Sequence, residues 1–254
     1  MKKLLMGAVA GTLLAPAAAH AETTGYVDVA YEYSEITGGG GSADSWNLAA
    51  AVQHDFANGW SLQGDGRSTQ FDNGSFTVGA SYTALHLYTA LNPSIDVGGF
   101  VGMLDFSNDA TIIGVESRVH QGQWSLQGSL GYTQFHVTLG TSEAWDARVL
   151  GDWFVNPDTS VRPSLSYTEW HEGNFTHKQT GVGLGAAHRL GNGLEVYGAY
   201  VHSFDDTTPA GQYEVDTFRV GMRLHLNAGD LQTITNEGAR WNGAAGMYEA
   251  FGRW

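Results

Sequence analysis

The chain has 254 residues, no cysteine, 35 glycines and a formal net charge of −14 at pH 7. The acidic balance argues against nucleic acid as a partner, and without cysteine no disulfide can stabilise an exported form of the protein. The many glycines also disfavour a mainly helical fold.

The first 21 residues have the features of a secretory signal peptide. They combine Lys2 and Lys3, a short apolar stretch and Ala19-His20-Ala21, which fits the A-x-A cleavage pattern. The apolar stretch is too short for a membrane-spanning helix. We expect residues 1–21 to be removed, which reduces the basic residues from 12 to 10 against 26 acidic ones and gives a formal charge of −16.

Twelve stretches of roughly ten residues follow, and each alternates apolar and polar side chains with the two-residue period of a β-strand. The breaks between them are rich in Gly, Asn, Asp and Pro, which favour turns. The longest breaks are Thr37–Ser45, His171–His177 and Asp205–Tyr213. The predicted strands are Tyr26–Glu35, Trp46–Phe56, Trp60–Phe71, Phe76–Leu91, Ile95–Phe106, Thr111–His120, Trp124–Val137, Trp145–Val155, Val161–Trp170, Lys178–Arg189, Leu194–Phe204 and Val215–Leu226.

Most of these strands have one apolar and one polar face. In the eighth, Val149 and Trp153 alternate with Arg148 and Asp152. A soluble sandwich turns the apolar face inward, whereas a membrane barrel turns it outward and lines its interior with polar groups. Aromatic residues gather at strand ends on the apolar face, as girdles at two bilayer interfaces require. The pattern favours an all-β fold, a transmembrane antiparallel up-and-down β-barrel of about 12 strands, over a sandwich.

The fourth stretch breaks this alternation. If all apolar residues face outward, Leu85 and Leu87 are out of phase with Tyr82. We therefore expect a β-bulge near Thr83–Ala84, because one extra residue restores the phase.

The last strand carries Arg219, Gly221, Leu224 and Leu226 at the spacing of the assembly signal of Gram-negative outer-membrane β-barrels. The chain resembles that family, as a small porin-like barrel, over residues 22–226. The resemblance implies the outer membrane of a Gram-negative bacterium, contact with its lipid and lipopolysaccharide, and recognition of these four residues by the barrel-assembly machinery. In the family, aromatic residues usually fill the last apolar positions and the chain usually stops there, whereas 28 residues follow here.

The alternation places charges of both signs inside the barrel. Opposed acidic and basic groups at a constriction select solutes in porins, so we predict a passive channel for small polar or ionic solutes. The acidic loops favour a modest cation preference. The alternative is a closed structural or surface-interaction barrel in which the charges pair, because twelve strands lie between filled and open barrels. The predicted pore-lining residues are Asp65, Arg67, Glu116, Arg118, Asp146, Arg148, Asp152, Arg162, Arg219 and Arg223.

An outer-membrane lipid-modifying enzyme is a further alternative. Some members of the outer-membrane barrel family that the chain resembles are lipid hydrolases with His-x-Ser on an outward strand face, and that motif does not occur here. His136-Val137-Thr138 is the nearest spacing, and His202 and Ser203 are adjacent, which sends them to opposite faces. We predict no enzymatic activity, no catalytic residue, no metal site and no cofactor.

Residues 227–254 lack strand alternation. Trp241, Tyr248 and Trp254 are among the residues that make them too apolar for a pure linker. We expect a periplasmic C-terminal tail or plug. A periplasmic extension, a plug folded into the lumen, a partner-binding segment and a disordered end are the alternatives.

Overall fold

The computed structural model describes residues 23–37, 41–72, 77–105, 109–137, 140–173, 175–208, 211–226 and 229–251. The predicted signal peptide, residues 1–21, lies outside the described residues. The strands are β1 (Thr23–Thr37), β2 (Gly41–Asp55), β3 (Trp60–Asp72), β4 (Thr77–Asn92), β5 (Ile95–Asp105), β6 (Asp109–Gln121), β7 (Trp124–Val137), β8 (Gly140–Asn156), β9 (Thr159–Glu172), β10 (Phe175–Arg189), β11 (Leu194–Thr208) and β12 (Gly211–His225).

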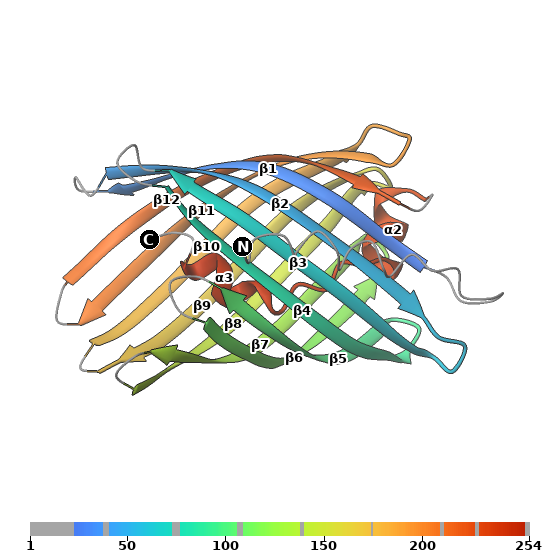
Figure 1. Ribbon diagram of the computed structural model, residues 1–254. Helices are drawn as coiled ribbons and strands as arrows, with labels where there is room; N and C mark the ends of the chain where they lie inside the picture. The colour runs from blue at the N-terminus through green and yellow to red at the C-terminus, as the bar shows by residue number, and fades with distance from the viewer. Residues whose placement is uncertain are drawn as a thin grey trace, which may run out of the picture.

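The strands form one closed barrel in which each strand pairs with its neighbours in sequence (Figure 1). All pairs are antiparallel, and β1 closes the ring against β12, from Tyr26 opposite His225 to Thr37 opposite Glu214. Closure lets the backbone groups of every strand bond within the sheet, as a bilayer core demands. The predicted twelve-stranded, antiparallel, up-and-down barrel is confirmed.

The short turns lie where the sequence predicts them, but all three of the expected long loops are largely strand. β1 runs to Thr37 and β2 begins at Gly41, β9 runs to Glu172 and β10 begins at Phe175, and β11 runs to Thr208 and β12 begins at Gly211. The prediction of loops over these segments is wrong at its edges. Ladder hydrogen bonds join backbone groups, so pairing continues beyond the last regular apolar position.

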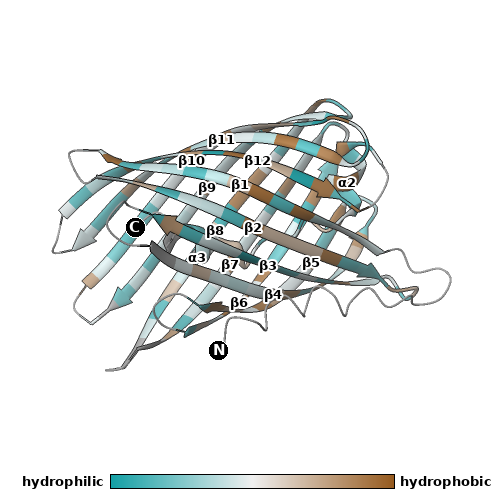
Figure 2. Ribbon diagram, turned by 45° about the horizontal axis from the view of Figure 1, so that its top comes forward, coloured by the Kyte–Doolittle hydropathy of each residue, from teal (hydrophilic) through white to brown (hydrophobic). Residues whose placement is uncertain are grey.

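The outer surface is apolar. Leu48, Val149 and Val220 are 56%, 42% and 59% exposed, on the outward face. Figure 2 shows hydrophobic and hydrophilic residues alternating along the strands. Aromatic pairs stand on this surface at two levels of β7 and β8: Trp124 stacks on Trp153 with 5.9 Å between ring centroids, and Tyr132 and Trp145 lie 4.9 Å apart. This is the aromatic arrangement that the sequence predicts for two interfaces.

β4 has no bulge at Thr83–Ala84, so that prediction is wrong. Its pairing with β3 and β5 is regular there, and the irregularity lies between Ala90 and Asn92. Tyr82 faces the interior and is buried, whereas Leu85 faces outward. The assumption that fails is that every apolar residue faces lipid, because part of the interior is itself apolar.

The C-terminal segment after β12 lies inside the barrel. Helix α2 (Leu231–Glu237) begins after Asp230, whose side chain accepts a hydrogen bond from the Thr233 N–H at 2.7 Å. Helix α3 (Ala245–Phe251) contacts β4, β7, β8 and β9. Figure 1 shows α2 near one end of the barrel and α3 deeper inside it. Within the described ranges, neither helix is long and apolar enough to cross a membrane.

Candidate functional site

The structure places all ten predicted pore-lining side chains inside the barrel. The more accessible of them, Arg162 and Asp152, are 20% and 19% exposed. They do not form one row along the wall. They separate into groups around residues 229–251, which we call the luminal segment. The most buried members are Asp65, Glu116, Arg118, Asp146 and Arg148.

Arg118 and Gln63 hold the backbone of the luminal segment. Arg118 donates to the carbonyls of Thr235 and Asn236 at 3.1 and 3.0 Å, and its guanidinium lies 4.4 Å from the ring centroid of Trp241. Gln63 donates to the Trp241 carbonyl at 2.7 Å and accepts from its N–H at 3.1 Å. Backbone groups that strands cannot satisfy are thus bonded by luminal side chains, so this segment is docked by specific contacts.

An apolar pad lies on one side of the lumen, where the luminal segment packs. Tyr82 and Tyr248 make an edge contact with ring centroids 5.0 Å apart. Ala244 and Ala245 are fully buried beside them. The inward apolar side chains of the wall explain why strict polar lining fails here. The pad consists of Ala80, Tyr82, Ala84, Phe100, Leu104, Ala110, Ile112, Phe135, Ala144 and Trp170.

His86 contacts two of the predicted pore-lining acids, Asp65 and Glu116. Its ring nitrogens lie 2.7 Å from Asp65 Oδ1 and 2.6 Å from Glu116 Oε1, and the ring is fully buried. Glu116 also accepts from the N–H of Gly243 at 3.2 Å. The wall and the luminal segment therefore share one buried polar network, in which a charge is stable only because it is paired.

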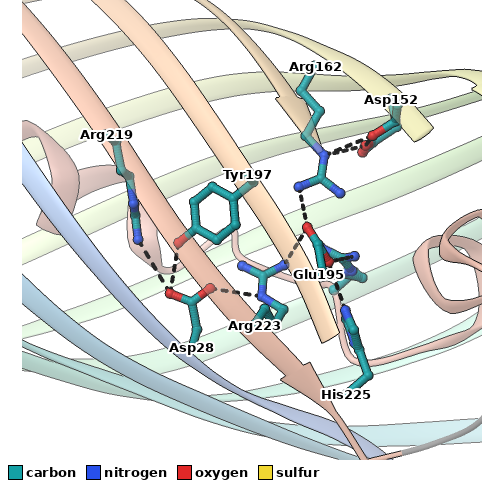
Figure 3. Close-up of polar contacts among 10 residues, drawn as sticks. Asp28, Asp152, Arg162, Glu195, Tyr197, Arg219, Arg223 and His225 are labelled. Carbon is teal, nitrogen blue, oxygen red and sulfur yellow. Dashed lines mark hydrogen bonds and ion pairs between the residues drawn. The ribbon is translucent and has the colours of Figure 1, made fainter. Parts of the chain in front are cut away.

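Arginines and carboxylates alternate on the opposite side (Figure 3). Glu195 is fully buried and lies 2.7 Å from Arg162 and 2.8 Å from Arg240 of the luminal segment. Burial lowers the pKa of the Arg240 guanidinium to about 10, which leaves it protonated at neutral pH. His225 also contacts Glu195, at 2.7 Å. The ion pair between Arg240 and Glu195 therefore attaches the luminal segment to β11.

Asp28 collects a second set of contacts in the same view. Arg223 lies 3.0 Å and Arg219 3.8 Å from its carboxylate, and the Tyr197 hydroxyl donates to it at 2.9 Å (Figure 3). Asp152 pairs with Arg162 at 2.6 Å. The charges on this wall are mostly compensated by neighbouring strands.

Glu249 on α3 is surrounded by three arginines. Its carboxylate forms ion pairs with Arg67 at 2.8 Å, with Arg148, and with Arg219 at 3.8 Å. Beside it lies a cavity of about 250 Å³, lined by these arginines and by Arg162, Arg223 and Arg240, among others. The luminal segment fills the apolar side of the barrel and leaves its open space on the arginine side.

The possible hydrolytic groups do not assemble. His202 pairs with Asp216 at 2.8 Å, whereas Ser203 is buried on the other face of β11. The side chain of His136 and all of Thr138 lie outside the described residues. Across the part of the chain that the structure describes, no three His, Asp or Glu side chains gather as a metal site would require.

Known proteins match this chain by fold and not by sequence. No family model and no curated protein matches it. An outer membrane channel from Pseudomonas putida F1 matches with a TM-score of 0.59 and 11% identity, over 83% of this chain and 97% of the other. The translocator domain of autotransporter NalP from Neisseria meningitidis matches with a TM-score of 0.50 and 13% identity, over 86% and 92%. Porins also match, at TM-scores of 0.46 and 0.47.

The chain has the closed β-barrel fold of these outer-membrane proteins. A closed ring of strands with an exposed apolar belt is the arrangement of a transmembrane β-barrel. The residues of the predicted assembly signal lie on β12 or just after it. Leu224 and Leu226 are on the lipid face, whereas Arg219 faces the lumen. A Cβ added at Gly221 would lie 2.5 Å from the Tyr197 ring, so a glycine has a packing reason here as well.

Sequence reasoning about this barrel missed the residues of the luminal segment. Arg240 and Glu249 lie outside the strands, so the alternation of apolar and polar residues does not predict where their side chains point. His86 also escaped, although it shares the inward parity of Tyr82 and Ala84. The signal that was present is composition: an apolar, aromatic segment after the last strand has to bury its rings, and the lumen is the nearest place.

Proposed function

We propose that this protein is a passive outer-membrane channel for small polar or ionic solutes, without enzymatic activity, and that its luminal segment is a plug. One observation carries the proposal. The plug packs on the apolar pad of one wall and leaves a charged cavity of about 250 Å³ along the other. A barrel whose only requirement is stability has no need to keep a charged cavity open beside the plug.

The contacts of the plug suit a closure that can be released. Some are hydrogen bonds from wall side chains to backbone carbonyls of the plug, as at Arg118. Others are ion pairs, as at Glu249. Each has a polar group that water can replace when the segment leaves, so release exposes a lumen that is already lined by charge. The apolar contacts lie at the pad, in a smaller cluster of Leu231 with Phe154 and Ala187, and between the rings of Trp241 and Tyr88.

A closed structural barrel is the second candidate, and the filling itself favours it. Trp241 and Leu231 are 1% and 0% exposed, and a buried ion pair between Arg240 and Glu195 joins the plug to β11. In that case the segment is a permanent core of the barrel.

Conductance in planar bilayers separates the two candidates. We would refold the mature chain and a variant lacking residues 228–254 in detergent, and check folding by heat-modifiable mobility. For a plugged channel, the full chain gives brief small openings and the truncated barrel conducts steadily. A truncated barrel that folds but stays closed would support the structural reading, and equal conductance of both proteins would exclude a plug.

We also propose that the barrel-assembly machinery recognises β12 through Arg219, Gly221, Leu224 and Leu226, and that the outward belt contacts lipid and lipopolysaccharide. Leu224→Ala with Leu226→Ala changes only lipid-facing positions. Such a variant should refold normally in detergent yet assemble poorly in cells. Normal assembly in cells would remove these leucines from the signal.

A further inference from the structure

Three arginines reach one point in the lumen from three separate parts of the barrel. Arg67 is on β3, Arg148 on β8 and Arg219 on β12. Around the closed ring these strands are three, five and four steps apart. Each arginine lies near the middle of its strand. Their guanidinium groups therefore meet near the axis, at mid-height, where a solute has to pass.

Glu249 is the group on which they converge. Its carboxylate pairs with all three arginines, although it belongs to α3 and not to the wall. The acids of the wall are only partly available to these arginines: Asp28 lies 3.8 Å from Arg219 and is shared with Arg223, and Asp146 interacts electrostatically with Arg148. Three partly buried cations held together repel one another unless an anion lies between them. The wall therefore forms an anion site, and the plug supplies the anion.

The chemistry of the site suits a carboxylate. A guanidinium presents planar N–H donors that match the two oxygens of a carboxylate, and it stays charged when partly desolvated. Arg67 and Arg219 each keep a buried Nε that makes no hydrogen bond to the described residues. The adjoining cavity of about 250 Å³ could hold roughly eight waters at their liquid volume, which is room for a small organic acid.

We propose that Arg67, Arg148 and Arg219 form a binding site for the carboxylate of a small anionic solute, and that Glu249 occupies this site as an intramolecular substitute. Solute and plug then exclude one another at the same three guanidinium groups. This deepens the proposed channel function and rests on it for the role of the solute. Binding itself does not require conduction.

The test measures equilibrium binding of succinate to the full-length barrel by calorimetry. Succinate repeats the end of the Glu249 side chain, a carboxylate on two methylene groups. The protein is kept in a zwitterionic detergent without a carboxylate and in a buffer free of carboxylate and phosphate. Glu249→Gln removes the internal competitor and keeps its shape. Glu237→Gln is the matched control, because Glu237 is also in the plug but its side chain forms no ion pair with any described residue.

We expect Glu249→Gln to bind succinate at least about tenfold more tightly than the unaltered chain, because an occupied site lowers apparent affinity by its free fraction. Glu237→Gln should match the unaltered chain. Adding Arg219→Gln to Glu249→Gln should abolish the gain. Neutral succinamide should not bind, and inorganic phosphate should bind more weakly than succinate.

Several results would overturn the assignment. They are no gain in Glu249→Gln when it folds normally, an equal gain in Glu237→Gln, or a gain that survives Arg219→Gln. Phosphate binding as tight as that of succinate would show that the arginines recognise charge alone. If succinate binds as expected but the truncated barrel does not conduct, the channel function fails and the site stands. If the barrel conducts and succinate does not bind, the proposed carboxylate site fails and the channel function stands.

Discussion

A disulfide between the wall and the plug should hold the barrel closed. The change is Asp146→Cys on β8 with Gly246→Cys on α3. An ideal Cβ at position 246 lies 3.7 Å from the Cβ of Asp146, within the range of about 3.5–4.5 Å found in disulfides. The bridge spans about 100 residues of chain, for which chain entropy predicts about 4.7 kcal/mol of stabilisation. The native chain has no cysteine that could pair wrongly.

The substitutions control for one another. Gly246→Cys alone places its Cβ 2.3 Å from Asp146 Oδ2, so it should loosen the plug, and Asp146→Cys in the double variant removes that oxygen. The same double variant is measured oxidised and reduced in a planar bilayer, with bridge formation checked on a non-reducing gel. We expect openings to vanish in the oxidised form and to return with reductant. Equal conductance of the bridged and reduced forms would refute the reasoning, because ions would then pass without movement of the plug.

Three further predictions concern the outer surface, the plug and the constriction. Val149→Arg puts a charge on the lipid face and should lower the free energy of unfolding in lipid vesicles by about 2–4 kcal/mol, measured by urea titration; no change would place position 149 outside the bilayer core. Trp241→Ala should weaken docking of the plug by roughly 3–5 kcal/mol because the ring is buried, and a protease should then cleave the plug while the barrel stays folded; unchanged resistance would contradict this. Removing residues 228–254 takes Glu249 from Arg67, Arg148 and Arg219, so the open barrel should prefer anions, contrary to the cation preference expected from the sequence; a cation-selective reversal potential in a salt gradient would show that the acidic rim controls selection.

Several features of the barrel follow from local pattern. Trp124–Val137 is predicted and observed with the same ends, because an alternating run bounded by turn residues defines a strand without outside help. The inward position of Arg148 and the outward position of Val149 follow from the same alternation. The error at Tyr82 and Leu85 has a physical source. Parity assigns residues to two faces, but it does not say what each face touches.

By itself the sequence determines a twelve-stranded barrel, its lipid face and the inward direction of Arg67, Arg148 and Arg219, because these depend on alternation two residues at a time. Only the tertiary structure decides that these three arginines meet, since their convergence requires closure of β1 on β12. The tertiary structure alone also decides that the partner of these arginines is Glu249. Arg67 and Glu249 are 182 residues apart in the chain. Helix α3 is too short to be stable alone, and it is held where the lumen buries the ring of Tyr248 and pairs the charge of Glu249.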